Sequence, residues 1–203
     1  MPEYKLSYFN VKALGEPLRL LMSYGNLPFE DIRIEFEDWP TVKPTTPMGQ
    51  MPVLSVDGKQ VHQSLAMARY LANQVGLAGA NDWENLTIDI VVDTINDFRL
   101  KIVAAYYDPD ENGKEKKFAI IKKEVIPFYL EKLEEIARDN NGYLANGKLT
   151  WADLYFVGLL DYLNHLANTD LIVDQPNLQK VVKNVTSIES IKNWIDKRPQ
   201  TDM

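Results

Sequence analysis

Three short segments carry side chains or backbone groups that could bind or activate a ligand. Tyr8 lies where a strand-like run gives way to a helical pattern, so its phenol would point over the carboxyl edge of a sheet. Met51-Pro52 begins another strand-like run, and a proline there can expose the amide and carbonyl of Met51 to a peptide-like ligand. Gln63-Ser64 precedes a helix; Ser64 is a good N-cap, and free amides at the positive helix end favour a carboxylate. Together the three segments predict a site for a peptide that carries a carboxylate.

The sequence contains no cysteine, so a group other than a thiol would have to carry the chemistry at this site. Without a thiol, the chain cannot exchange disulfides, form a thiolate zinc site or use a cysteine nucleophile. His62 and His165 are far apart in the sequence, so we expect no metal site and interpret both as structural residues. The phenol of Tyr8 is therefore the candidate reactive group. A buried structural tyrosine explains this residue equally well when it is considered alone.

Residues 1–79 combine short strand-like runs with amphipathic helical segments. Alternating runs at residues 4–9 and 29–36 flank a helical segment, which is the pattern of a parallel β-α-β unit. Asp57-Gly58 separates two further runs and predicts an antiparallel hairpin, and a helix at residues 64–73 follows it. Residues 39–47, between these units, are irregular and rich in proline. This order predicts a thioredoxin-like domain, a small mixed sheet with helices packed on it.

Residues 80–203 have an almost continuously helical period and predict an all-α domain. Apolar spacing marks a long helix from about residue 88 to 107, and a second helix is expected at residues 116–140 with a kink at Pro127. Residues 149–166 are apolar around most of the circumference, which indicates a helix buried at the domain centre. Thr150 and Asp153 have the spacing of a capping box. Two shorter helices are expected at residues 176–184 and 187–197.

Charge and hydropathy exclude several kinds of partner. The 203 residues include 22 Lys and Arg against 29 Asp and Glu, a net charge of −7, so we expect no basic surface for nucleic acid. No apolar run approaches the roughly 18 residues of a membrane helix, and the first residues lack an apolar signal segment. We therefore expect a cytoplasmic protein without a membrane partner.

Six sequence blocks carry a resemblance to a known family. In chain order they read YKLSYFN, EDWP, MGQMPVL, DGKQVHQSLAMARYLA, VDTINDF and LTWADLYF. With these blocks the whole chain resembles a glutathione transferase of the sigma class, whose relatives include glutathione-dependent prostaglandin D synthase. The resemblance implies a thioredoxin-like domain of β-α-β-α-β-β-α order that binds glutathione, followed by a helical-bundle domain that contributes the electrophile site.

The resemblance also implies roles for individual residues. Tyr8 would be the catalytic phenol that stabilises the thiolate of glutathione. Asp97 would reach across a homodimer to the γ-glutamyl amine of glutathione in the neighbouring subunit. The implied glutathione contacts are Tyr8, Trp39, Lys43, Gln50, Met51, Pro52, Gln63, Ser64 and Asp97. Trp39 and Lys43 would hold the glycyl carboxylate, the backbone of Met51 would pair with the cysteinyl residue, and Gln63 and Ser64 would bind the γ-glutamyl carboxylate.

The second substrate would lie in a largely apolar and aromatic groove between the domains. Such a groove suits hydrophobic electrophiles such as lipid-derived enals, aryl halides or a prostaglandin endoperoxide. Its expected lining residues are Phe9, Leu14, Arg99, Val103, Tyr106, Tyr107, Tyr155 and Leu159.

Two positions depart from the family pattern. Several members of the class place an arginine where this chain has Leu14, so Arg19 or a water would have to support the phenol. Gln50 stands where relatives often carry lysine. Two alternatives to general conjugation therefore stay open: a glutathione-dependent prostaglandin-H2 D-isomerase, and a structural or ligand-carrying protein similar to the S-crystallins.

Overall fold

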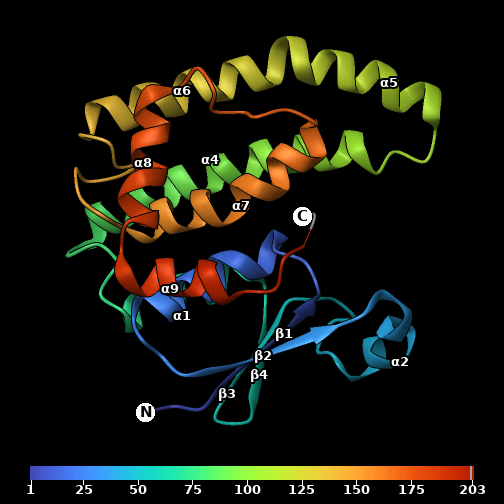
Figure 1. Cartoon of the computed structure of the whole chain (residues 1–203), viewed down its shortest axis with the longest axis vertical. Coiled ribbons are helices and arrows are strands. Elements are labelled where there is room, and N and C mark those ends of the chain that lie inside the picture. Colours follow the sequence, from blue (N-terminus) through green and yellow to red (C-terminus); the bar gives the residue numbers. More distant parts are fainter. Residues whose placement is uncertain (202) are drawn as a thin grey trace.

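The computed structural model describes residues 1–201 and 203 and shows a sheet domain below a bundle of helices (Figure 1). The sheet has the strand order β2-β1-β3-β4. β1 (Tyr4–Phe9) runs parallel to β2 (Phe29–Ile34) and antiparallel to β3 (Val53–Val56), and β3 pairs with β4 (Lys59–His62). These pairings confirm the predicted parallel unit and hairpin. Asp57 and Gly58 form the hairpin turn with positive φ angles of 50° and 79°.

Helices of the first domain lie between the sheet and the bundle. Tyr4, Leu6 and Tyr8 of β1 are buried and alternate with less buried residues, as expected for a strand with one face on the core. This face meets α1 (Glu16–Tyr24) and α3 (Ser64–Gln74), which pack against each other (Figure 1). The one-turn helix α2 (Trp39–Val42) lies away from them and completes the β-α-β-α-β-β-α order. The fold class predicted from sequence is confirmed.

Within the part of the chain that the structure describes, six α-helices form the second domain. They are α4 (Asp82–Tyr106), α5 (Glu111–Ile120), α6 (Ile126–Asp139), α7 (Trp151–Ala167), α8 (Pro176–Thr186) and α9 (Glu189–Lys197). α7 is buried along most of its length and packs against α1, α4 and α8, as predicted for the central helix. The side chain of Asp153 accepts hydrogen bonds from the backbone N–H groups of Thr150 and Leu144, each at 2.7 Å. The predicted capping box is therefore present.

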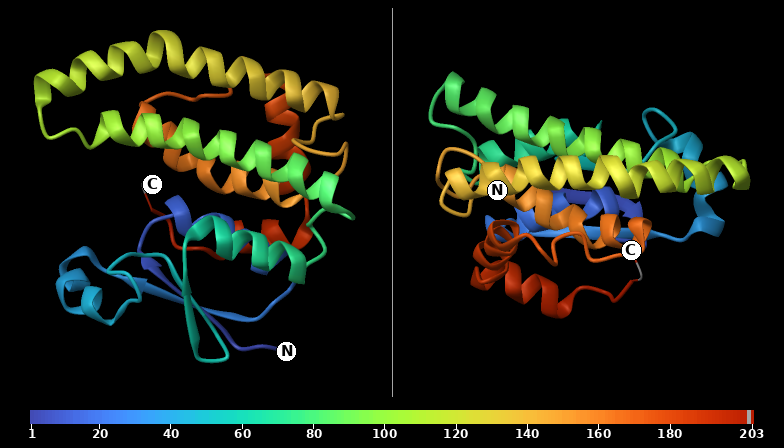
Figure 2. Two further views of the ribbon diagram at one scale, coloured as in Figure 1. Left: turned by 180° about the vertical axis from the view of Figure 1, so that it is seen from behind. Right: turned by 90° about the horizontal axis from the view of Figure 1, so that it is seen from above.

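The second long helix differs from its prediction. It begins at Glu111, not Lys116, because Asp110 caps it by accepting a hydrogen bond from the Asn112 N–H at 3.2 Å. The irregularity expected at Pro127 lies just before it, where Ile121–Val125 form a wide π-helical turn between α5 and α6. Proline cannot donate to the carbonyl one turn earlier and its ring crowds that group, so the preceding turn widens. α5 and α6 thus continue as one long element beside α4 (Figure 2).

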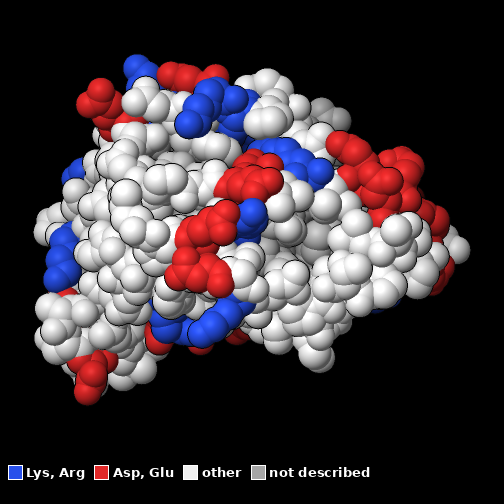
Figure 3. Space-filling view, turned by 90° about the horizontal axis from the view of Figure 1, so that it is seen from below, with Lys and Arg blue, Asp and Glu red and all other residues white. Residues whose placement is uncertain are grey.

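Charged side chains are interspersed on the face below the sheet. In Figure 3, basic side chains occur in small groups close to acidic ones, with uncharged surface between them. Lys5, for example, pairs with both Glu3 and Glu30. Within residues 1–201 and 203, every helix is too short or too polar to cross a bilayer.

Candidate functional site

A cavity of about 430 Å³ lies where the carboxyl end of β1 and the start of α3 meet α4. It brings together residues that are distant in the sequence and come from both domains. Nine of its lining residues were predicted as site residues: Phe9, Leu14, Trp39, Gln50, Met51, Pro52, Gln63, Ser64 and Arg99. The remaining lining residues are Gly49, His62, Leu65 and Asn96.

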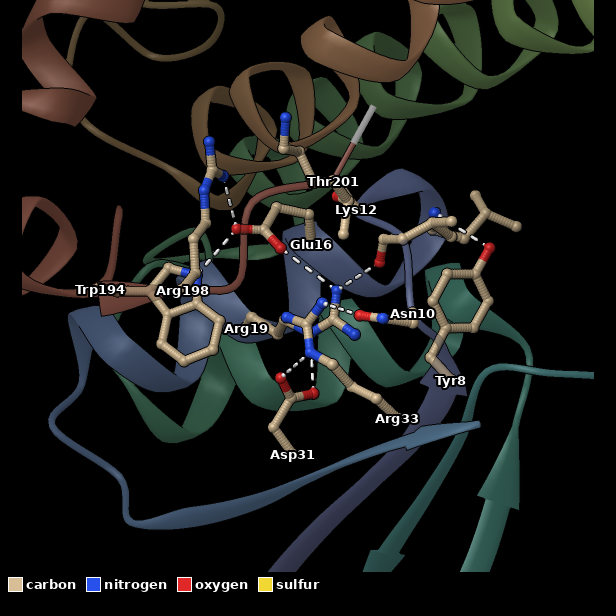
Figure 4. A network of polar contacts seen from close by, with 12 residues as sticks. Tyr8, Asn10, Lys12, Glu16, Arg19, Asp31, Arg33, Trp194, Arg198 and Thr201 are labelled. Atoms are coloured by element: carbon tan, nitrogen blue, oxygen red, sulfur yellow. Dashed lines mark hydrogen bonds and ion pairs between the residues drawn. The ribbon is translucent and has the colours of Figure 1, made fainter. Parts of the chain in front are cut away.

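Tyr8 is buried beside this cavity, between Phe9 and the loop that leads into α1 (Figure 4). The N–H of Leu14 donates to the phenol oxygen at 3.4 Å, which leaves the O–H proton free to donate elsewhere. A Cβ at Gly15 would lie 2.6 Å from Cδ1 of Tyr8, so the close approach of loop and ring requires glycine. Burial raises the pKa of Tyr8 to about 12, opposed by the Leu14 N–H and the charges of Arg19 and Arg99. Tyr8 is therefore a neutral hydrogen-bond donor at physiological pH.

The backbone just before β3 carries the predicted peptide-binding segment, Met51-Pro52. The Met51-Pro52 bond is cis, an isomer that the sequence left open. Met51 lines the cavity just before β3, whose first residue, Val53, pairs with Ser7 and His62. The backbone of Met51 therefore lies at the sheet edge of the cavity, where an extended ligand could add to the strand.

α3 begins at Ser64, the predicted first residue of the helix, but the residue that caps it differs from the prediction. Ser64 is the first helical residue, and Gln63, not Ser64, occupies the cap position with φ 73° and ψ 101°. The prediction that Ser64 caps the helix was wrong, because its backbone already has helical geometry. Gln63 lies in a backbone region that residues other than glycine rarely adopt, and such positions concentrate at functional sites. Both residues line the cavity, next to the free amides of the first helical turn.

Aromatic and basic side chains border the opposite end of the cavity. Trp39, the first residue of α2, packs edge-on against Phe9 with ring centroids 5.4 Å apart, and Phe9 stacks on Phe36. Lys43 is exposed and is not among the lining residues. Its Cε lies 3.3 Å from where a Cβ at Gly49 would sit, so its side chain passes beside the cavity wall.

The second domain contributes Arg99 and Asn96 from α4. The Nε and Nη2 atoms of Arg99 donate to Oδ1 of Asn96 at 3.0 and 2.9 Å. Sequence reasoning missed Asn96, although its spacing of three residues from Arg99 places both on one helix face. It also missed the placement of His62, which was interpreted as structural and lines the cavity from β4.

The structure does not bring the remaining predicted residues to this cavity. Asp97 is exposed on α4 and lines a separate cavity of about 360 Å³ with Leu100, Lys101, Ala104 and Tyr129. Val103 and Tyr106 are half-buried and Tyr107 is exposed. Tyr155 and Leu159 lie in the core of α7, where burial raises the pKa of Tyr155 to about 12. The role of Asp97 toward glutathione stays a prediction. So does the contact of an electrophile with the five groove residues, which are Val103, Tyr106, Tyr107, Tyr155 and Leu159.

Comparison with known proteins identifies the family of the chain. Residues 4–73 match the family model of the glutathione S-transferase N-terminal domain, and residues 96–198 match that of the C-terminal domain. The chain belongs to the glutathione S-transferase family. It is 66% identical to a glutathione S-transferase of Anopheles gambiae over the full length of both chains. It is 60% identical to glutathione S-transferase S1 of Drosophila melanogaster, over 98% of this chain and 80% of that protein.

A solved structure shows the same fold. The structure of prostaglandin synthase D of Nilaparvata lugens superposes with a TM-score of 0.95 at 48% identity, covering 98% of this chain and 100% of that one. The chain is thus a transferase of the sigma-class type, and glutathione is its cosubstrate.

A cation from α1 lies beside the phenol of Tyr8. The loop after β1 carries the uncharged Leu14 in place of the arginine that the resemblance implies, so Arg19 or a water was expected to support the phenol. Arg19 supplies the charge from α1: its Cζ lies 6.0 Å from the centroid of the Tyr8 ring. The expectation that Arg19 could take this place agrees with the geometry.

Proposed function

We propose that this enzyme ionises the thiol of glutathione at Tyr8 and conjugates the thiolate to hydrophobic electrophiles. The observation that carries the proposal is the cavity beside Tyr8, which is lined by nine of the predicted site residues, drawn from both domains. The phenol donates its O–H to sulfur, while the thiol proton leaves to solvent. Sulfur then forms a bond to carbon. With an enal, the C=C π bond breaks, its electron pair moves to the carbonyl oxygen, and the resulting enolate takes a proton from solvent; with an aryl halide, the carbon–halogen bond breaks and halide departs with its electron pair.

The proposed orientation of glutathione follows the polarity of the cavity. Its γ-glutamyl carboxylate lies at Gln63 and Ser64, since the amides at the start of α3 favour an anion. Its cysteinyl backbone pairs with Met51, and Pro52 shapes the chain there. The glycyl carboxylate lies at the end of the cavity opposite the start of α3, where it is bound by Trp39, Lys43 and Gln50. In this orientation the sulfur reaches Tyr8, which lies between the two carboxylate sites.

The electrophile occupies the part of the cavity formed by Phe9, Leu14 and Arg99. Residues 1–79 are then the glutathione-binding domain, and residues 80–203 contribute to the electrophile site through α4. The predicted groove continues from there along Val103, Tyr106, Tyr107, Tyr155 and Leu159.

We also propose that the enzyme is a homodimer that acts in the cytoplasm. α4 carries the exposed apolar residues Trp83, Leu86 and Ile90 at i, i+3 and i+7, and Asp97 follows on the same face at i+14. A second copy that covers this face would receive Asp97 at its own glutathione site. The separation of Asp97 from the cavity of its own chain supports this arrangement.

The test compares Tyr8→Phe with Tyr4→Phe, a matched change on the same face of β1. Tyr4 is buried at the start of this strand, at the opposite end from Phe9, which lines the cavity. Calorimetry measures glutathione binding, and initial rates are measured with a generic aryl halide. The proposal predicts binding by all three proteins, with turnover lost only in Tyr8→Phe. Full activity of Tyr8→Phe would refute the mechanism, and absence of glutathione binding by the native protein would favour a structural role.

Prostaglandin-H2 D-isomerisation is a second candidate activity. It is favoured by the 48% identity to the chain named prostaglandin synthase D. Isomerisation needs the same thiolate, but glutathione is regenerated and no conjugate accumulates. Product analysis after incubation with the endoperoxide therefore separates the two activities: prostaglandin D2 without net loss of glutathione indicates isomerisation.

A further inference from the structure

A buried carboxylate links the start of α1 to the last helix of the chain. Glu16 is 1% exposed and accepts hydrogen bonds from two side chains at the end of the second domain (Figure 4). The Nε1–H of Trp194 donates to Oε1 at 2.8 Å, and Nη1 of Arg198 donates to the same oxygen at 2.7 Å. The other oxygen, Oε2, accepts from Nη1 of Arg19 at 3.2 Å. Glu16 therefore connects α9 and the residue after it to the cation beside Tyr8.

Arg19 is fixed by contacts on several sides. It is fully buried, its Nε donates to Oδ1 of Asp31 at 2.9 Å, and its Nη1 also donates to the carbonyl of Val11 at 2.8 Å. Val11 belongs to the loop whose Leu14 N–H donates to the phenol oxygen. A cation beside an aromatic ring draws electron density from it, which makes a phenol O–H a stronger donor. The position of Arg19 therefore affects both the charge near Tyr8 and the loop that holds its oxygen.

We propose that Arg198 and Trp194 are positioning residues for catalysis: through Glu16 they hold Arg19 beside Tyr8, so the last helix tunes the phenol as a donor to glutathione. The inference rests on the proposed role of Tyr8.

Charge balance supports an effect of Arg198 beyond packing. Glu16 alone would largely neutralise Arg19, whereas Arg198 offsets the negative charge of Glu16 and preserves a net positive potential near the phenol. The connected network contains four cations, Lys12, Arg19, Arg33 and Arg198, and three anions, Glu16, Asp31 and Asp161. Loss of Arg198 therefore removes the excess positive charge.

Other groups also face Tyr8 and stay unchanged in the test. Arg99 on α4 lowers the pKa of Tyr8, whereas Tyr107, which follows α4, raises it. Tyr162 on α7 is close enough for Tyr8 to raise the pKa of Tyr162. Within residues 1–201 and 203, the side chain of Glu16 is hydrogen-bonded to Arg19, Trp194 and Arg198 and to none of these residues, so variants at Arg198 isolate the contribution of the network.

The experiment measures the pKa of the glutathione thiol in the complex, from the ultraviolet absorbance of the thiolate as pH is varied. The variants are Arg198→Ala, Arg198→Lys and Trp194→Phe, and the control is Ile191→Val. Ile191 is buried in α9, so its truncation loosens the helix while the hydrogen bonds of Glu16 to Trp194, Arg198 and Arg19 are kept. We expect Arg198→Ala to raise the bound thiol pKa by about half a unit, which lowers the thiolate fraction about threefold below the pKa.

The rate profile should separate positioning from a general loss of structure. For Arg198→Ala we expect kcat to fall at low pH and to approach the native value once the thiol is fully ionised, with the KM for glutathione unchanged. Arg198→Lys keeps the charge, so its bound thiol pKa should lie close to that of the native protein. Trp194→Phe should raise the bound thiol pKa, as Arg198→Ala does. Ile191→Val should leave the bound thiol pKa unchanged.

An unchanged thiol pKa in Arg198→Ala would overturn the inference, as would an equal shift in Ile191→Val. The bound thiol pKa of the native protein distinguishes failure of this inference from failure of the proposed function. If the native complex ionises glutathione well below the free thiol pKa and Arg198→Ala does the same, only the role of the last helix is refuted. If the native complex does not ionise it, the role of Tyr8 fails and the inference fails with it.

Discussion

Replacement of Tyr8 by phenylalanine tests the chemistry at the level of one hydrogen bond. The phenol is buried, and burial raises its pKa to about 12. It therefore stays protonated and can donate a hydrogen bond throughout the usual pH range of the assay. A hydrogen bond to a charged group contributes about 1.5–3 kcal/mol, which corresponds to about 1.1–2.2 pKa units. Since a free thiol has a pKa of about 8.5, bound glutathione should have a pKa of about 6.3–7.4 in the native protein.

The effect on rate is smaller than the effect on ionisation. At pH 7 the thiolate fraction should fall by about 10- to 25-fold in Tyr8→Phe, from the pKa values above. A more basic thiolate is a better nucleophile, and with a Brønsted slope of about 0.4–0.5 each thiolate of Tyr8→Phe should react about 3- to 10-fold faster. Ionisation alone therefore predicts a loss of about threefold at pH 7, and any greater loss measures the contribution of Tyr8 to positioning.

The assay combines a thiolate titration of the binary complex with pH–rate profiles for native protein, Tyr8→Phe and the control Tyr4→Phe. We expect the bound thiol pKa to rise by at least one unit in Tyr8→Phe and to stay unchanged in Tyr4→Phe. The rate deficit of Tyr8→Phe should shrink as pH rises. A bound thiol pKa that is equal in all three proteins would refute the reasoning.

Three further predictions address other parts of the molecule. Leu14→Arg adds a cation beside the phenol and should lower the bound thiol pKa, measured by the same titration; an unchanged or raised pKa would show that the added charge does not reach the sulfur. Asp97→Asn should raise the glutathione Kd about tenfold in calorimetry, because a charge-assisted bond to the neighbouring subunit's ligand is lost; unaltered affinity would contradict that role. Asp153→Ala removes the acceptor of two backbone N–H groups, one of them in the buried Leu144, and should lower the unfolding free energy by about 2–4 kcal/mol in urea denaturation; a loss below about 1 kcal/mol would contradict the capping account.

Local sequence signals predicted the parts of the fold that short-range physics determines. Asp57-Gly58 specified the hairpin because its turn requires positive φ angles, and Thr150 with Asp153 specified the start of α7 because the cap bonds span three residues. Tyr8 was located by the change from strand to helix, which places a side chain at the sheet edge. The resemblance to a family then supplied the ligand, which the residues alone did not name.

The remaining features depend on contacts that local patterns do not contain. The unusual backbone of Gln63 places this residue at the cap position of α3, although serine has the stronger capping preference. Asn96 lines the cavity only because the fold brings α4 beside Phe9, Ser64 and other residues of the first domain. The connection from Glu16 to Trp194 spans 178 residues, so its partners become evident only in the folded chain.

A crystal structure of the glutathione complex tests the central claim most directly. We predict that glutathione occupies the cavity beside Tyr8, with its sulfur within hydrogen-bond distance of the phenol oxygen and its γ-glutamyl carboxylate at the start of α3. A larger cavity, about 660 Å³, lies along β4 and α3 and contains none of the predicted site residues. Glutathione bound there, or with its sulfur directed away from Tyr8, would contradict the account.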